Sequence, residues 1–118
     1  MGDLSKNFSK DEFKCKCNCG FFVKSDELVQ KLQRLRNKVK LRIKVNSGCR
    51  CVLHNLQVGG SENSSHLRGL AADITCSDMM LLLKCALGIF NRVGISGSYI
   101  HVDVDDTKPQ GIYWVYVE

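Results

Sequence analysis

The stretch from Asn63 to Asp73, Asn-Ser-Ser-His-Leu-Arg-Gly-Leu-Ala-Ala-Asp, constrains the fold of this chain more than any other segment. It holds His66 and Asp73, and between them lie Gly69 and a pair of alanines. Glycine suits a tight turn, and small residues suit a closely packed strand after it. Such a turn brings the two polar side chains together. Imidazole nitrogen and carboxylate oxygen belong to the ligand set of catalytic zinc, which takes three protein ligands and keeps a fourth position for water.

The third ligand that such a site requires is predicted to be His101. It lies in the run Ser98-Tyr-Ile-His-Val-Asp-Val, where apolar and polar residues alternate as in a half-buried strand. Because successive side chains of a strand point to opposite faces, His101 and Asp103 would face a cleft together, with the aliphatic residues between them facing the core. A lone histidine is more often an ordinary surface or hydrogen-bonded residue. The coincidence of three features favours a metal site instead.

Ser64-x-His66-x-x-Gly69-x-Ala71-x-Asp73, followed by His101-Val-Asp-Val, resembles the zinc D-Ala-D-Ala carboxypeptidase family (peptidase family M15), which includes peptidoglycan endopeptidases of bacteria and phage endolysins. The resemblance covers about residues 8 to 104. Three further pieces are similar to the small single-domain branch of that family: Glu12-Phe-x-Cys-x-Cys-x-Cys-Gly, Ser47-Gly-x-Arg50, and His54-Asn with Val58-Gly-Gly.

The resemblance implies a Zn²⁺ ion held by His66, Asp73 and His101, and peptidoglycan or its peptide stems as the substrate. It also implies that Arg50 reaches the substrate near the scissile bond, where its planar fork suits a carboxylate or a developing oxyanion. The alternative for Arg50 is a surface ion pair.

Asp103 is our candidate for the general base, because it shares a strand face with His101. Asp105 and Asp106 are less well-placed substitutes. Several branches of the family carry an acidic residue or a histidine a few positions before the last zinc ligand, and residues 95–99 of this chain contain neither. Asp103 is therefore either the base or a residue that orients a metal ligand.

Length and composition predict one soluble globular domain over residues 1–118, since 44% of the residues are hydrophobic and 25% are charged. The N-terminus lacks the apolar core of a signal peptide, and no apolar run approaches the roughly 20 residues that span a bilayer. We therefore expect a protein that is cytoplasmic as synthesised and is not inserted in a membrane, and we expect a monomer. The resemblance implies that it acts on the cell wall after release, as in phage lysis.

A net charge of +5 favours anionic partners without selecting among them. The basic residues gather between Lys31 and Lys44, where a solvated helical face explains them. We expect no nucleic-acid partner, because no basic strand interleaved with aromatic residues is present.

The chain has seven cysteines, an odd number that cannot pair completely within one chain. Cys15, Cys17 and Cys19 alternate, so an extended segment would place them on one face, where they could hold a structural metal. This spacing lacks the two-residue gap that is usual in zinc knuckles. We expect the cysteines to be mostly reduced and dispensable for the chemistry. A cysteine nucleophile, Cys49 or Cys51 near His54, is the sharper alternative, although no base and orienting partner are evident.

The pattern of the chain predicts an α+β fold with a mainly antiparallel sheet. The family resemblance implies the same hedgehog/DD-peptidase-like architecture, with helices on one face of the sheet and the zinc in a cleft across the other. The helices are predicted at a capping box from Ser9 to Glu12, after Ser25 through Val39, over residues 51–58, and after Ser77-Asp78 through Phe90. The strands are predicted over 41–46, 71–76, 98–104 and 112–117, with an extended segment over 15–22 and a turn framed by Gly94 and Gly97.

Three functions follow as hypotheses: a zinc peptidase acting on peptidoglycan stems, a non-catalytic zinc-stabilised binding module, and a thiol enzyme. The hedgehog signalling domain, which is related to the family, keeps a similar zinc site and acts by binding, so ligands alone do not establish catalysis.

Overall fold

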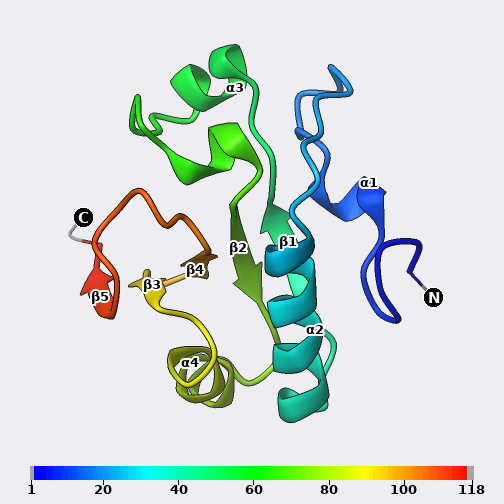
Figure 1. Ribbon diagram of the computed structural model, residues 1–118, viewed down its shortest axis with the longest axis vertical. Helices are drawn as coiled ribbons and strands as arrows, with labels where there is room; N and C mark the ends of the chain where they lie inside the picture. Colours follow the sequence, from blue (N-terminus) through cyan, green and yellow to red (C-terminus); the bar gives the residue numbers. More distant parts are fainter. Residues whose placement is uncertain (1, 117–118) are drawn as a thin grey trace.

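The computed structural model describes residues 2–116. Its strands form one five-stranded sheet in the order β1-β2-β4-β3-β5, in which only the β3–β5 pair is parallel (Figure 1). The predicted α+β class with a mainly antiparallel sheet is confirmed. Along the chain the elements are α1 (Lys10–Phe13), α2 (Asp26–Val39), β1 (Lys44–Ser47), α3 (Val52–Gln57), the 3-10 turn η1 (Ser65–Arg68), β2 (Ala71–Thr75), α4 (Met79–Leu87), β3 (Arg92–Ile95), β4 (Ile100–Asp103) and β5 (Ile112–Val115). Within the described range, no helix combines the length and the apolar character needed to cross a membrane.

Short polar side chains begin the helices at the predicted places. Ser25 Oγ accepts a hydrogen bond from the third N–H of α2 at 3.3 Å, and Asp78 Oδ1 does the same for α4 at 3.1 Å. At α1 the Glu12 carboxylate accepts from the Ser9 N–H at 2.7 Å. These bonds satisfy backbone groups that have no partner within the first turn of a helix.

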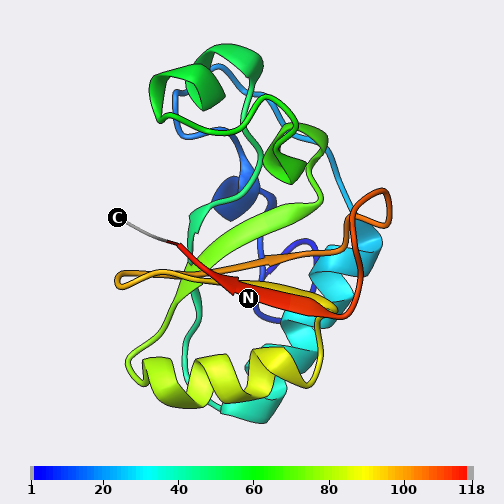
Figure 2. The ribbon, with the colours of Figure 1, turned by 90° about the vertical axis from the view of Figure 1, so that its left-hand side faces the viewer.

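The hydrophobic core lies between the sheet and the pair formed by α2 and α4. The predicted leucine and valine stripe of α2 is buried and packs with Ile74 of β2 and Val102 of β4. Figure 2 shows α2 and α4 lying together, whereas α3 and η1 lie at the other end of the molecule. Because side chains alternate along each strand, Asp73, His101 and Asp103 are turned to the face opposite the core.

Two local predictions were wrong. Residues 16–19 form a turn and a bend instead of continuing an extended segment, because Asn18 (φ 67°) and Gly20 (φ 83°) adopt the left-handed conformation that reverses a chain. The turn predicted between Gly94 and Gly97 begins only after Ile95, because residues 92–95 form the strand β3, which the sequence did not predict. Glycine weakens a strand pattern, but here it makes room for an aromatic ring, since a Cβ at Gly94 would lie 2.8 Å from Trp114 Nε1.

The remaining elements begin or end within a few residues of the predicted positions. The strand predicted over 98–104 is shorter at both ends, and α4 ends before Phe90. The last predicted strand is observed as β5, and its residue 117 lies outside the described residues.

Candidate metal centre and active-site cleft

His66 is positioned by the tight turn that precedes β2. Its N–H donates to Ser64 Oγ at 3.2 Å, which fixes the start of η1. Gly69 ends the turn with φ 71°, and a Cβ there would lie only 2.5 Å from the Val23 carbonyl oxygen. A residue without a side chain is therefore required where the chain enters β2. The turn leaves the His66 ring 2% exposed and facing the sheet.

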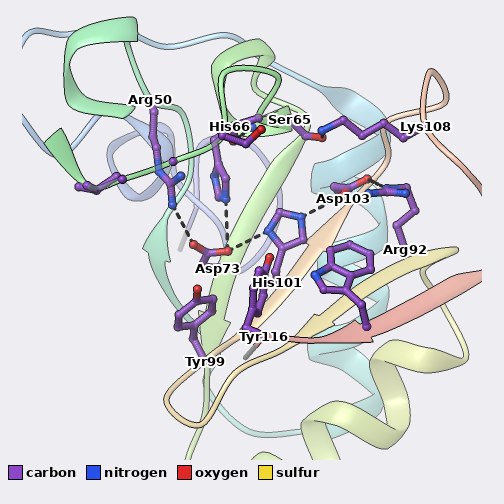
Figure 3. Close-up of a pocket in the computed structure, with 16 residues that line it drawn as sticks. Arg50, Ser65, His66, Asp73, Arg92, Tyr99, His101, Asp103, Lys108 and Tyr116 are labelled. Atoms are coloured by element: carbon purple, nitrogen blue, oxygen red, sulfur yellow. Dashed lines mark hydrogen bonds and ion pairs between the residues drawn. The ribbon is translucent and has the colours of Figure 1, made fainter. Parts of the chain in front are cut away.

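Asp73 and His101 meet because β2 and β4 pair in a register that sets them opposite each other. Asp73 Oδ1 lies 3.2 Å from His66 Nε2 and 3.0 Å from His101 Nδ1. One ligand atom from each residue lies within 4.8 Å of the others, and all three side chains are buried (Figure 3). The structure thus brings together the three residues that the sequence predicted as ligands.

The outer nitrogen of each ring is held by an acceptor. His66 Nδ1 lies 2.6 Å from the Gly48 carbonyl oxygen, and His101 Nε2 lies 2.8 Å from Asp103 Oδ2. Because a carbonyl and a carboxylate only accept hydrogen bonds, these nitrogens carry the protons. In rings that carry a proton only on the outer nitrogen, as metal-bound histidines would, the lone pairs of His66 Nε2 and His101 Nδ1 point to the same place as Asp73 Oδ1. Three electron-rich atoms converge on one point, an arrangement that fits a bound cation.

The electrostatics of the three residues also favour positive charge between them. Burial by itself would raise the pKa of Asp73, but hydrogen bonds with His101 and His66 outweigh it and hold that pKa below its usual range. Burial would lower the pKa of His101, whereas its bonds to Asp103 and Asp73 raise it. The same point that attracts a proton in the metal-free protein can attract a metal ion.

Asp103 lies behind the His101 ring, on the side away from Asp73 (Figure 3). Its side chain is buried, with 1% of the residue exposed, and both carboxylate oxygens have hydrogen-bond partners. Oδ2 lies against the His101 ring, while Oδ1 accepts hydrogen bonds from Arg92 Nε at 2.8 Å and from the Asp105 N–H at 3.1 Å. Each oxygen is therefore already hydrogen-bonded. Of the two roles that the sequence left open, this geometry favours orientation of a ligand.

Arg50 is hydrogen-bonded to the second carboxylate oxygen of Asp73, Oδ2. Its Nη2 donates to Asp73 Oδ2 at 3.1 Å, its Nε to Ser47 Oγ at 3.1 Å, and its Nη1 to Asn55 Oδ1 at 3.3 Å. Asp73 Oδ1 remains available to the two histidines. The alternative of a surface ion pair does not fit, because the Arg50 side chain is only 13% exposed and lines the cleft.

Asp105 and Asp106, the alternatives to Asp103 as general base, do not line the cleft. Asp105 is fully buried and accepts from Ser65 Oγ at 2.7 Å and from Thr107 Oγ1 at 2.6 Å, and it also pairs with Arg68. Burial would raise its pKa, but the bonds to Thr107 and Ser65 lower it to about 2. Asp106 is exposed and lies outside the cleft wall. Among residues 2–116, the carboxylates that line the cleft are those of Asp73 and Asp103.

The thiol alternative lacks a base. Cys49 Sγ exchanges hydrogen bonds with the backbone of Val23, and Cys51 Sγ contacts other thiols and the His54 backbone N–H. Neither thiol is hydrogen-bonded to a histidine ring in the described part of the chain, so a cysteine nucleophile would have no activating partner.

A family model described as Peptidase M15 matches residues 6–105, most of the chain. The chain belongs to the M15 peptidase family. Membership in M15 indicates a metallopeptidase, and the matched range contains the three converging residues together with Arg50 and Asp103. A comparison with curated proteins found no match.

This M15 peptidase has a cleft of about 330 Å³ around the three residues. The loop from Val58 to Ser61 lines it, as does Arg50, and Lys108 and the aromatic residues Tyr99, Trp114 and Tyr116 also contribute to the wall. Figure 3 shows Tyr99 and Tyr116 on the side of Asp73 opposite His66. The Trp114 ring centre lies 5.6 Å from that of His101 and 4.9 Å from the Arg92 guanidinium carbon.

Sequence reasoning missed Arg92 and the aromatic wall. The signal for the wall was present in Ile112-Tyr-Trp-Val-Tyr, a strand rich in aromatic residues. This strand pairs in parallel with β3, and the pairing places Trp114 next to Gly94. No pattern in the sequence indicated that pairing.

Proposed function

We propose that this M15 peptidase is a zinc enzyme that hydrolyses a peptide bond in the stem peptides of bacterial peptidoglycan, as a D-Ala-D-Ala carboxypeptidase or an endopeptidase. The observation that supports this most is the convergence of His66 Nε2, Asp73 Oδ1 and His101 Nδ1 at the wall of a cleft. Three protein ligands with open space on the remaining side match the coordination of catalytic zinc.

The residues around the proposed zinc would have distinct tasks. When bound, zinc would polarise the scissile carbonyl and lower the pKa of water from about 15.7 towards about 7. Asp103 would hold the His101 ring with Nδ1 turned inward, and Arg50 would fix Asp73 while presenting its guanidinium to the cleft. The closed contacts of Asp103 support an orienting role over that of a general base.

The charge of the cleft supports a substrate that carries carboxylates. Among residues 2–116, three basic side chains line it, those of Arg50, Arg92 and Lys108, against the acids Asp73 and Asp103. A divalent cation would make the cleft strongly positive. Stem peptides bear free carboxylates, which would be attracted there, and the rings of Tyr99 and Tyr116 would pack against the apolar parts of the substrate.

The direct test is the incubation of soluble muropeptides with zinc-loaded protein, followed by mass spectrometry of the products. We expect cleavage of one bond type, which identifies the specificity, and loss of cleavage after chelation or in His101→Ala. Cleavage that survives both treatments would refute the zinc mechanism.

A non-catalytic zinc-stabilised binding module is the second candidate. It is favoured by one observation, that both carboxylates lining the cleft among the described residues are already engaged. This candidate predicts stoichiometric zinc and retention on peptidoglycan without any release of peptides. Product release by the unmutated protein would exclude it.

A further inference from the structure

Four cysteines that do not line the active-site cleft gather in space, and one of them follows Arg50 directly in the chain. Cys15, Cys17 and Cys19 come from the loop between α1 and α2, and Cys51 immediately precedes α3. Their sulfur atoms lie within 4.8 Å of one another. Figures 1 and 2 both show this loop rising beside α3. We refer to these four residues as the thiol cluster.

The spacing of the sulfur atoms fits tetrahedral metal coordination. Cys15 Sγ lies 3.4 Å from Cys17 Sγ and 3.8 Å from Cys51 Sγ, and Cys17 Sγ lies 3.7 Å from Cys51 Sγ. A tetrahedral zinc ion with bonds of about 2.3 Å to sulfur requires sulfur atoms about 3.8 Å apart. A disulfide would bring two of them to about 2.05 Å, and all seven cysteines are free.

The backbone conformation of residues 15–20 brings the cluster cysteines together. The left-handed residues Asn18 and Gly20 curl the Cys-x-Cys-x-Cys segment, so its side chains converge instead of lying along a strand. Backbone N–H groups then point at the sulfurs: that of Cys51 donates to Cys15 Sγ at 3.4 Å, and that of His54 donates to Cys51 Sγ at 3.4 Å. Such donors stabilise metal-bound thiolates.

Apolar contacts contribute little to holding α3, the helix next to the cluster, in place. In α3 only Asn55 is buried, while Val52, Leu53 and Leu56 are 77%, 64% and 74% exposed. Apolar packing therefore does not anchor this helix. A link from Cys51 to the 15–19 loop would anchor it, and with it Arg50, whose N–H donates to the His66 carbonyl oxygen at 3.0 Å.

We propose that Cys15, Cys17, Cys19 and Cys51 bind one structural zinc ion. Four thiolates complete a tetrahedral shell and leave no position for water, so this ion is structural and not catalytic. It ties the 15–19 loop to the chain segment that carries Arg50, and so stabilises one wall of the cleft. Binding of zinc displaces the thiol protons to solvent and requires no oxidant.

Metal counting on matched variants tests the proposal independently of hydrolysis. Reduced, zinc-loaded protein is expected to lose about one zinc ion per chain in the exposed-residue variant Cys17→Ser/Cys19→Ser, and to keep that ion in His101→Ala. Cobalt substitution should give thiolate-to-cobalt charge-transfer absorption in the unmutated protein, in His101→Ala and in the control Cys76→Ser. The absorption should vanish in Cys17→Ser/Cys19→Ser. Unchanged metal content and absorption in that double variant would overturn the proposal.

Alkylation provides a second test that needs no variant. Cys17 and Cys19 are exposed, so in metal-free reduced protein a thiol reagent can reach both and modify them at a measurable rate. Zinc should slow their modification at least about tenfold, and a chelator should restore it, because a coordinated thiolate is held by the metal. Equal rates with and without zinc, or a disulfide within the cluster of protein kept under reducing conditions, would show that the cluster is not a zinc site.

Discussion

Asp103 lies behind the His101 ring, and an aspartate there could either orient the ring or act as a general base. The variant Asp103→Asn distinguishes these two roles. If Asp103 orients the ring, Asp103→Asn should weaken zinc binding about 10- to 100-fold, because an amide turned to accept from His101 Nε2 brings its NH₂ towards the Arg92 guanidinium. Zinc affinity measured by competition with a chromophoric chelator checks this.

A general base would give a different result for the same variant. Zinc affinity would stay unchanged, and turnover at saturating zinc would fall about 100- to 10,000-fold. That outcome would contradict the orienting role.

Arg50 is predicted to act on catalysis through a charge-assisted contact. Because its guanidinium lines the cleft and fixes Asp73, Arg50→Ala should lower kcat/KM by roughly tenfold or more, the equivalent of about 1.5 to 3 kcal/mol. Steady-state kinetics on a muropeptide at saturating zinc measures the loss. The exposed Arg34→Ala serves as the matched control and should behave as the unmutated protein. Unchanged kcat/KM in Arg50→Ala would limit its role to metal affinity.

At the scale of residues, the sequence predicted those whose identity is dictated by chemistry. The sequence singled out His66, Asp73 and His101 because few side chain types can hold zinc, and the structure places their potential ligand atoms close together. Cys51 was not connected with the other cluster cysteines, since contact between residues 36 positions apart depends on the folded path of the chain. Arg92 was missed for the same reason.

Among the elements, the turn from η1 into β2 determines where the His66 ring points. Gly69→Ala should destabilise the protein by about 1 to 3 kcal/mol, because the new Cβ meets the Val23 carbonyl oxygen in a left-handed backbone conformation. Thermal unfolding measures the change.

Gly59→Ala is the matched control for this prediction. Gly59 has a similar φ of 73°, and a Cβ there meets nothing within 4 Å. Its cost should therefore be limited to backbone strain. Equal losses in the two variants would show that the contact with Val23 contributes nothing.

Element prediction succeeded where local patterns agree with tertiary packing and failed where they do not. The stripe of α2 and its Ser25 cap specify a helix independently of the rest of the fold. In β3, by contrast, Gly94 is explained by the rings of Trp114 and Tyr116, which lie about twenty residues later in the chain and pack over it. The turn at 16–19 likewise depends on Asn18 adopting a left-handed conformation, which residue type alone does not dictate.

At the scale of the whole molecule, we propose that residues 1–118 act as one domain, since a single core cluster runs from Phe8 near the N-terminus to Val102 of β4. This core joins the loop of the thiol cluster, through Phe13, to the strands of the metal centre. The overall class followed from element order, but the parallel edge pair β3–β5 required knowledge of long-range pairing.

Asp105 is expected to contribute to the acid stability of the domain. Its pKa is lowered from 3.8 to about 2 in the folded protein, so the unfolded chain binds more protons between these values. Its stabilising contribution is therefore present above about pH 4 and is lost as the pH falls to about 2. Asp105→Asn should be less stable than the unmutated protein near neutral pH, and the difference should shrink across this window.

Urea unfolding at a series of pH values measures this difference. Asp106→Asn, at the exposed neighbour, is the control and should not change the pH dependence. A difference between Asp105→Asn and the unmutated protein that stays constant from pH 6 to pH 2 would show that ionised Asp105 has no special role.

We propose that zinc at His66, Asp73 and His101 makes this M15 peptidase active on peptidoglycan stems. It is tested most directly by titrating the metal-free protein with zinc while bound metal and muropeptide hydrolysis are measured in the same samples. We expect no hydrolysis without metal, a rate that rises as this site fills, and no hydrolysis by His101→Ala at the same zinc concentrations. Hydrolysis by the metal-free protein, or its absence when the three-residue site is full, would contradict the claim.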